Sequence, residues 1–153
     1  MEESLNFLDA IGKKFDLPGR DPVSFSPLTL AYIGDAAYEM VVRTVIVRKG
    51  NAPVNKLNRR ASELSCAGRQ SKMIRALKEE LTEEERKIYK RGRNATSHTK
   101  AKNASTADYR RATGFEAVIG YLYLCGRTDR MMELIRTGME RTQKNDHEKN
   151  ESE

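Results

Sequence analysis

The sequence is poor in long apolar runs, in cysteine and in histidine. It has no stretch of eighteen apolar residues, so we expect no membrane-spanning helix, and its first residues lack the basic start and apolar core of a secretory signal. The only two cysteines, Cys66 and Cys125, form no CxxC motif, so we expect reduced thiols and a cytoplasmic protein. His98 and His147 are too far apart, and too short of neighbouring ligands, to indicate a zinc site or a catalytic triad.

Two nucleotide-binding signatures are also missing, namely the glycine-rich phosphate loop and the aromatic RNP motif of RNA-binding sheets. With 153 residues, 38% of them hydrophobic and 33% charged, the chain is typical of one domain with a core. Its formal net charge of +6 is unevenly spread. Residues 86–111 hold nine basic side chains and one acid, a net charge of +8, which leaves −2 for the rest. Such a segment is typical of a protein with a polyanionic partner.

The most informative stretch is SPLTLAYIGDAAYEMVVRTVIVRKG, residues 26–50. Ser26 is a good N-cap, Pro27 suits the first helical position, and Gly50 is typical of a residue that closes a helix. Because apolar residues surround this predicted helix, we expect it to be buried. Asp35 lies in its middle, and a buried carboxylate is costly unless it is paired, protonated or bound to a metal.

The rest of the chain predicts further helices and shows no period-two pattern of β-strands, so the expected fold class is all-α. We expect helices at 4–14, at 53 to about 81 with a break near 66–68, at 82 to about 91 with a Thr82–Glu85 capping box, at 106–125, and at 129 to about 141. We divide the chain into an N-terminal extension (1–25), one helical domain (26–142) and a polar, disordered tail (143–153).

The predicted helix at 106–125 has the same peculiarity as the first one. Its apolar centre holds one acid, Glu116, among small residues that would let two helices approach closely. If the helices cross there, Asp35 and Glu116 meet, and two adjacent carboxylates cannot both ionise cheaply without a cation. Ligands that are all oxygen select a hard ion, Mg²⁺ or Mn²⁺.

The alternative is that Asp35 and Glu116 each form a structural ion pair with an arginine such as Arg43, Arg110 or Arg111. Glu39, one turn after Asp35, fits a salt bridge better than a metal site.

A second candidate site lies where the predicted helix from residue 82 gives way to a loop at Gly92. Cationic and amide side chains gather there and can contact phosphates of a nucleic acid: Lys90, Arg91, Arg93, Asn94, Lys100 and Lys102. Several of these cations lack nearby acids, which favours nucleic-acid binding over the alternative of an ordinary solvated helix end.

Three segments, LAYIGDAAYE, KRGRNA and YRRATGFEAVIGYLYL, together resemble the catalytic domain of ribonuclease III, most closely its small bacterial branch, Mini-ribonuclease III. The resemblance covers about residues 26–140, so the domain at 26–142 is expected to be catalytic. It implies an all-helical endonuclease domain that forms a homodimer and places double-stranded RNA in a groove between two active sites.

By the same resemblance, Asp35 is the signature aspartate, Glu116 is the second essential acid, and the two hold the metal. The full-length ribonuclease III pattern has three further acids, at positions that here hold Leu28, Ala31 and Thr113, so the metal shell is thinner.

The function implied is Mg²⁺-dependent (or Mn²⁺-dependent) hydrolysis of double-stranded RNA to give 5′-phosphates, with precursor 23S ribosomal RNA as substrate and a ribosomal protein as a candidate helper. Two alternatives remain open at this point. One is a non-catalytic RNA-binding module for ribosome assembly with the same fold. The other is a helical interaction protein whose basic loop only aids solubility.

Overall fold

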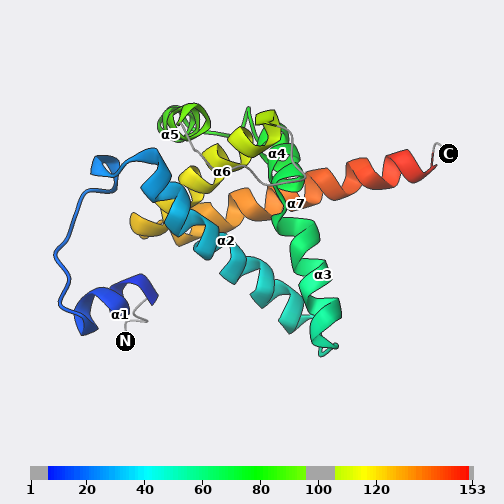
Figure 1. The fold of residues 1–153 in the computed structure, drawn as a ribbon, viewed down its shortest axis with the longest axis horizontal. Helices are drawn as coiled ribbons and strands as arrows, with labels where there is room; N and C mark the ends of the chain where they lie inside the picture. Colours follow the sequence, from blue (N-terminus) through cyan, green and yellow to red (C-terminus); the bar gives the residue numbers. More distant parts are fainter. Residues whose placement is uncertain (1–6, 96–105, 152–153) are drawn as a thin grey trace.

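The computed structural model describes residues 7–95 and 106–151 of the chain. In these ranges the structure is built of helices and contains no strand, which confirms the predicted all-α class (Figure 1). The elements are α1 (Phe7–Lys14), the 3-10 helix η1 (Pro22–Ser24), α2 (Pro27–Arg48), α3 (Val54–Ser65), α4 (Ala67–Ala76), α5 (Glu83–Asn94), α6 (Thr106–Leu124) and α7 (Thr128–Glu151). None of the described helices is long and apolar enough to cross a membrane.

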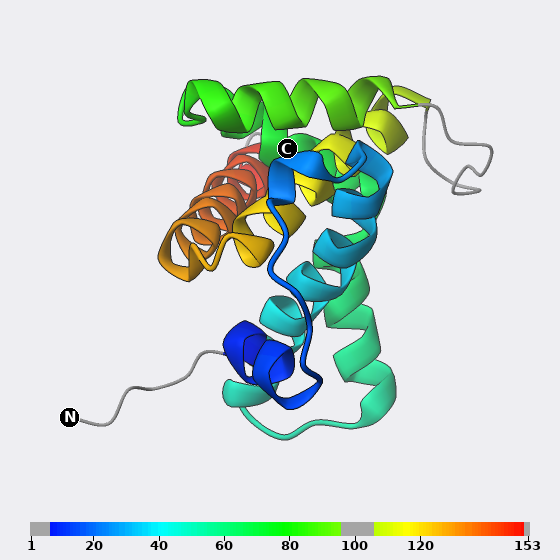
Figure 2. The ribbon, with the colours of Figure 1, turned by 90° about the vertical axis from the view of Figure 1, so that its left-hand side faces the viewer.

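Helix α6 is the centre of the fold. It packs against α2, α4, α5 and α7, and Figures 1 and 2 show these helices arranged around it. Phe115, Ile119 and Leu122 of α6 have no exposed surface. Burial of such side chains contributes about 1.5–3 kcal/mol each, so α6 is the element on which the positions of the others depend.

Helix α2 begins and ends as predicted, but it is not buried on all sides. The Ser26 hydroxyl accepts a hydrogen bond from the Thr29 amide at 3.2 Å, and Gly50 has a φ of +138°, which favours glycine. Leu30, Tyr38 and their neighbours at four-residue spacing face the core. The opposite face is exposed and apolar: Tyr32 is 82% exposed, and Met40 and Val47 are each 60% exposed. The prediction of a fully buried helix was wrong, because composition does not separate a core face from an open one.

The sequence predicts a loop that begins at Gly92, but the structure shows no loop there. Helix α5 continues through it to Asn94, and Gly92 is buried. A Cβ atom on Gly92 would lie 2.9 Å from the Cα of Gly114 and from the Cβ of Ala117, both on α6. The glycine therefore allows α5 and α6 to pack closely, a tertiary role that local sequence signals do not reveal.

Of two other predicted helix boundaries, one agrees with the structure and one does not. The break near residue 66 is confirmed, because Cys66 is extended between α3 and α4. The last helix begins at Thr128 but continues to Glu151, well past Arg141, where we expected it to end.

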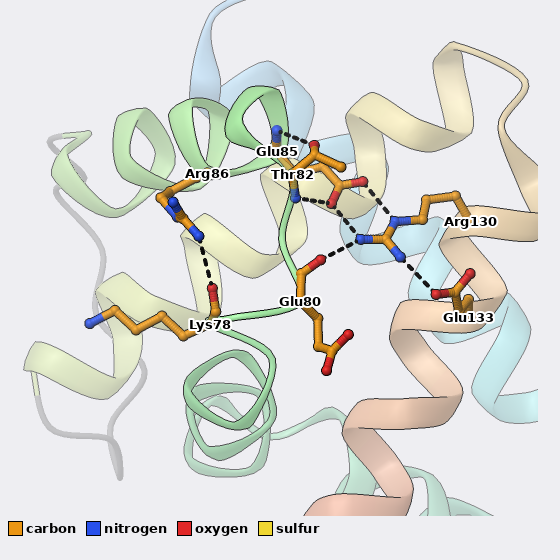
Figure 3. Close-up of polar contacts among 7 residues, drawn as sticks. All are labelled: Lys78, Glu80, Thr82, Glu85, Arg86, Arg130 and Glu133. Carbon is orange, nitrogen blue, oxygen red and sulfur yellow. Dashed lines mark hydrogen bonds and ion pairs between the residues drawn. The ribbon is translucent and has the colours of Figure 1, made fainter.

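The predicted Thr82–Glu85 capping box is present, and it belongs to a larger polar cluster (Figure 3). Glu85 is fully buried, yet both of its carboxylate oxygens accept hydrogen bonds from Arg130 of α7 at 2.9 Å. Arg130 also donates to the Glu80 carbonyl at 2.7 Å and to Glu133 at 2.8 Å. Burial by itself would raise the pKa of Glu85, but the hydrogen bonds from Arg130 and the Thr82 amide outweigh it and hold that pKa below its usual range. This buried ion pair joins the start of α5 to α7.

Candidate active site

The two predicted acids lie where α2 and α6 cross with their backbones in contact. A Cβ atom built on Gly34 of α2 would lie 1.8 Å from the Glu116 carbonyl oxygen. One on Gly120 of α6 would lie 1.9 Å from the Leu30 carbonyl oxygen. Only glycine fits at both positions. The crossing places Asp35, the residue after Gly34, beside Glu116, so the predicted meeting of the two helices at their small residues is observed.

The electrostatics of the pair show how close the two acids are. Burial raises the pKa of Glu116 to about 9, and the hydrogen bond and the charge of the neighbouring Asp35 carboxylate raise it as well. Near neutral pH, with no cation present, Glu116 therefore keeps its proton and donates a hydrogen bond to Asp35. We had expected both acids to be buried. Asp35 is in fact exposed, and Glu116 is the half-buried member of the pair.

The donor set fits a hard divalent cation. Both side chains offer oxygen ligands, and a cation would offset the burial and the neighbouring Asp35 charge that together raise the pKa of Glu116. Among the described residues no group of three or more histidine, cysteine, aspartate or glutamate side chains could hold a metal. Mg²⁺ commonly binds through one or two carboxylates and keeps several water ligands, so two acids suffice for it.

Two of the three alternative arginine partners of these acids, Arg43 and Arg111, are engaged elsewhere, and Arg110 makes no salt bridge with either acid among the described residues. The Arg43 Nε atom lies 3.1 Å from Glu39, and the Arg111 Nη1 atom lies 3.5 Å from Asp108. The Glu39–Arg43 contact is the salt bridge that we had favoured for Glu39 over a metal site. Structural ion pairs for Asp35 and Glu116 with Arg43 or Arg111 are therefore absent from the described part of the chain.

The three positions at which the full-length pattern carries further acids do not widen the site. Leu28 is 40% exposed and Ala31 is buried. Thr113 is buried, and its hydroxyl donates to the Tyr109 carbonyl at 3.0 Å. None of these side chains supplies a carboxylate, so a metal ion held by Asp35 and Glu116 would need water or substrate oxygen for its remaining ligands.

An aromatic pair next to the acids was not predicted from the sequence. Tyr38 of α2 and Phe115 of α6 have no exposed surface, and their rings meet edge to face with centroids 5.5 Å apart. The Tyr38 hydroxyl donates to the Leu64 carbonyl and contacts the Met73 sulfur at 3.4 Å. Burial raises the pKa of Tyr38, so it stays neutral. Because Phe115 immediately precedes Glu116, this contact helps to set the position of that acid.

The predicted RNA-binding residues that the structure describes lie on the last turns of α5. Lys90, Arg91 and Asn94 are exposed. Arg93 is half-buried, with its guanidinium 5.6 Å from the centre of the Tyr89 ring. Lys100 and Lys102 lie outside the described residues. We call Lys90, Arg91, Arg93 and Asn94 the basic strip; its helix packs on α6 at Gly114, two residues before Glu116.

Comparison with known proteins agrees with the fold. The Ribonuclease III domain family matches residues 28–127 of the chain. The chain is 50% identical over 118 residues to "Mini-ribonuclease 3" of Clostridium tetani, covering 76% of this chain and 78% of that protein. It is 44% identical over 115 residues to "Mini-ribonuclease 3" of Symbiobacterium thermophilum, covering 75% and 88% respectively. A crystal structure of a Fusobacterium nucleatum protein matches with a TM-score of 0.71 at 29% identity, over 76% of this chain and 95% of that one.

Proposed function

The chain belongs to the ribonuclease III family, in its Mini-ribonuclease 3 branch, and from this membership we propose how its two acids cleave RNA. It is an endoribonuclease that acts on double-stranded RNA. We propose that the activity depends on Mg²⁺, with Mn²⁺ as a substitute, held by Asp35 and Glu116, and that each cut leaves a 5′-phosphate. The observation that supports this proposal is that the two carboxylates lie side by side where α2 and α6 cross, with burial and the neighbouring Asp35 raising the pKa of Glu116.

The two acids contribute differently to the proposed reaction. Asp35 is exposed and is reached directly by a duplex laid against α2, whereas Glu116 is half-buried and held by the α2–α6 crossing. Asp35 and Glu116 would hold the Mg²⁺ ion, which when bound would supply positive charge near the attacked phosphate and lower the pKa of a neighbouring water. The protein supplies the position of that charge, and the basic strip supplies contacts to the phosphates of the duplex.

We propose that the enzyme acts as a homodimer through the open face of α2. Tyr32, Met40 and Val47 give that face an exposed apolar stripe, and such a stripe on one helix is typical of an association surface. Asp35 is exposed on the same helix, so a dimer built on this face would hold two acid pairs in one assembly. Dimerisation would account for the apolar exposure and would give the enzyme one acid pair for each strand of the duplex.

The proposed substrate is precursor 23S ribosomal RNA in the cytoplasm, with a ribosomal protein as helper. This part rests on the family resemblance, and the net charge of +6 is compatible with it. We propose residues 26–142 as the catalytic unit and residues 1–25 as an extension, in keeping with the family match to 28–127.

The test is cleavage of a perfectly paired RNA duplex by the full chain, with Mg²⁺ or with EDTA. Wild type should cut only with Mg²⁺, and Asp35→Asn and Glu116→Gln should each lose the activity while still binding the duplex. Glu140→Gln is the matched control, because that exposed acid pairs with Arg136 on α7 at 3.0 Å and lies outside the site. Cleavage in EDTA, or wild-type rates in Asp35→Asn, would show that the site is assigned wrongly. Binding without cutting in every metal would instead support the assembly-module alternative.

A further inference from the structure

A recessed pocket lies between α4, α5 and the first turns of α6. Its volume is about 340 Å³, at the small end of the range for ligand sites. Its lining includes five cationic side chains and no acidic one: Arg75, Lys78, Arg93, Arg110 and Arg111. The floor holds apolar core side chains, including Tyr89, which is 6% exposed.

The cations of this pocket are poorly neutralised by the protein itself. Arg111 has Asp108 at 3.5 Å. For Arg75, Lys78 and Arg110 the described part of the chain shows no carboxylate partner within salt-bridge distance. Figure 3 shows the Lys78 side chain pointing away from the Arg130 cluster, while its carbonyl accepts a hydrogen bond from Arg86 at 3.4 Å. A concave surface with charges of one sign focuses the electrostatic field, so an anion bound there relieves repulsion among the cations.

One of the lining guanidinium groups, that of Arg93, is held by contacts with its neighbours. The Arg93 guanidinium lies over the Tyr89 ring at 5.6 Å, and its Nε atom donates to the Asn94 side-chain oxygen at 3.4 Å. These contacts hold one planar cation in place, and guanidinium groups bind phosphate oxygens through two parallel hydrogen bonds. Pre-orientation of this kind reduces the entropy that binding must overcome.

We propose that this pocket binds one nucleoside polyphosphate, with the phosphates held by the cations and the ring system over the apolar floor. The shape favours a single free nucleotide over a duplex. A duplex is a broad rod whose phosphates contact cations that project from a surface, whereas this site is a small hollow between three helices. The pocket is separate from the Asp35–Glu116 pair, since neither acid lines it.

The pocket shares Arg93 and Asn94 with the basic strip. A bound nucleotide would therefore compete with RNA for those two side chains and lower the affinity for duplex RNA. Only this competition depends on the proposed RNA-binding function of the strip; nucleotide binding itself does not.

The first experiment measures ATP binding to the full chain by calorimetry in EDTA, which removes any metal from the catalytic pair. The test variant is Arg75→Gln combined with Lys78→Gln, two exposed positions of the pocket that lie outside the basic strip. The matched control is Arg59→Gln combined with Arg60→Gln, two exposed cations on α3. We expect saturable binding of one ATP by wild type, affinity weaker by roughly tenfold in the pocket variant, and affinity within about twofold of wild type in the control. Circular dichroism should show the same helix content in all three.

The second experiment measures duplex RNA affinity with and without ATP in the Asp35→Asn background, so that cleavage does not interfere. ATP should weaken RNA binding in the chain with an intact pocket and have less effect when Arg75 and Lys78 are replaced. The proposal fails if wild type shows no saturable ATP binding, or if the α3 control loses as much affinity as the pocket variant. It also fails if the pocket variant loses RNA affinity while ATP binding is unchanged, because the pocket would then be part of the RNA surface. If ATP binds as expected but no RNA is cut by wild type, the catalytic proposal alone is refuted.

Discussion

Replacing Glu116 by glutamine should destroy the activity and yet stabilise the metal-free protein. The pKa of Glu116 is raised from 4.5 to about 9. Between these two pH values the folded chain therefore keeps a proton on Glu116 that the unfolded chain has lost. An acid whose folded pKa is raised makes stability fall as the pH rises from the unfolded value toward the folded one. A glutamine does not titrate, and its amide can donate a hydrogen bond to Asp35 as the protonated acid does. The variant therefore does not lose stability as the pH rises through this range.

The size of this effect follows from the interval between 4.5 and the pH of the assay. At pH 7.5 that interval corresponds to about 4 kcal/mol as an upper bound. Glu116 is half-buried and water screens part of the penalty, so we expect a gain of about 1–2 kcal/mol. For a chain of this length the midpoint of thermal unfolding should rise by roughly 2–8 °C.

The assay is thermal unfolding of wild type and Glu116→Gln in EDTA, followed by circular dichroism from pH 5 to 8. The advantage of the variant should be small at pH 5 and grow with pH. Added Mg²⁺ should stabilise wild type and leave the variant unchanged, because only wild type has both ligands. The exposed control Glu140→Gln should show neither trend. A variant that is less stable than wild type in EDTA, or a difference that does not change with pH, would refute the assigned charge state of the pair.

Three further outcomes are expected. Gly34→Ala should destabilise the fold by at least about 3 kcal/mol and abolish cleavage, since the added Cβ meets α6 backbone at 1.8 Å; chemical denaturation measures it. Replacing Arg91 and Arg93 by alanine should weaken duplex binding and reduce the slope of log affinity against log salt by roughly one to two, measured by titration at several salt concentrations. Arg130→Gln should lower the free energy of unfolding by about 3–5 kcal/mol at pH 7, because Glu85 is left buried and unpaired. Since the folded pKa of Glu85 is depressed, that difference should be complete above pH 4.5 and shrink as the pH falls below it.

The glycine and arginine-to-alanine substitutions each have a control on another helix. Gly68→Ala in α4 places a Cβ where no atom lies within 4 Å, so it should be tolerated. Alanine at Arg59 and Arg60 removes two exposed cations from α3 and should leave the salt slope nearly unchanged. Equal effects in test and control variants would contradict the role assigned to the test residue.

The sequence predicted those features of the fold that depend on neighbouring residues, such as helix caps and runs of small side chains. Ser26 and Thr82 cap helices where their side chains suggested it, and the pattern of small residues predicted that α2 and α6 meet at Asp35 and Glu116. The Glu85–Arg130 ion pair was not predicted, because its members lie 45 positions apart and on different helices. No local pattern indicates such a partner.

The prediction that Asp35 is buried was also wrong, and the reason concerns function. The apolar composition of this helix suggested that Asp35 is desolvated, but Asp35 is exposed, and the raised pKa belongs to Glu116. A site that cuts a large polyanion needs one ligand within reach of the substrate and one held firmly by the fold. The Gly34 contact provides both at once, because it presses Glu116 against α2 and leaves the next residue, Asp35, at the surface. The same crossing buries Ala31, so a small side chain suits the packing there, whereas Leu28 is 40% exposed and packing does not account for the missing acid at that position.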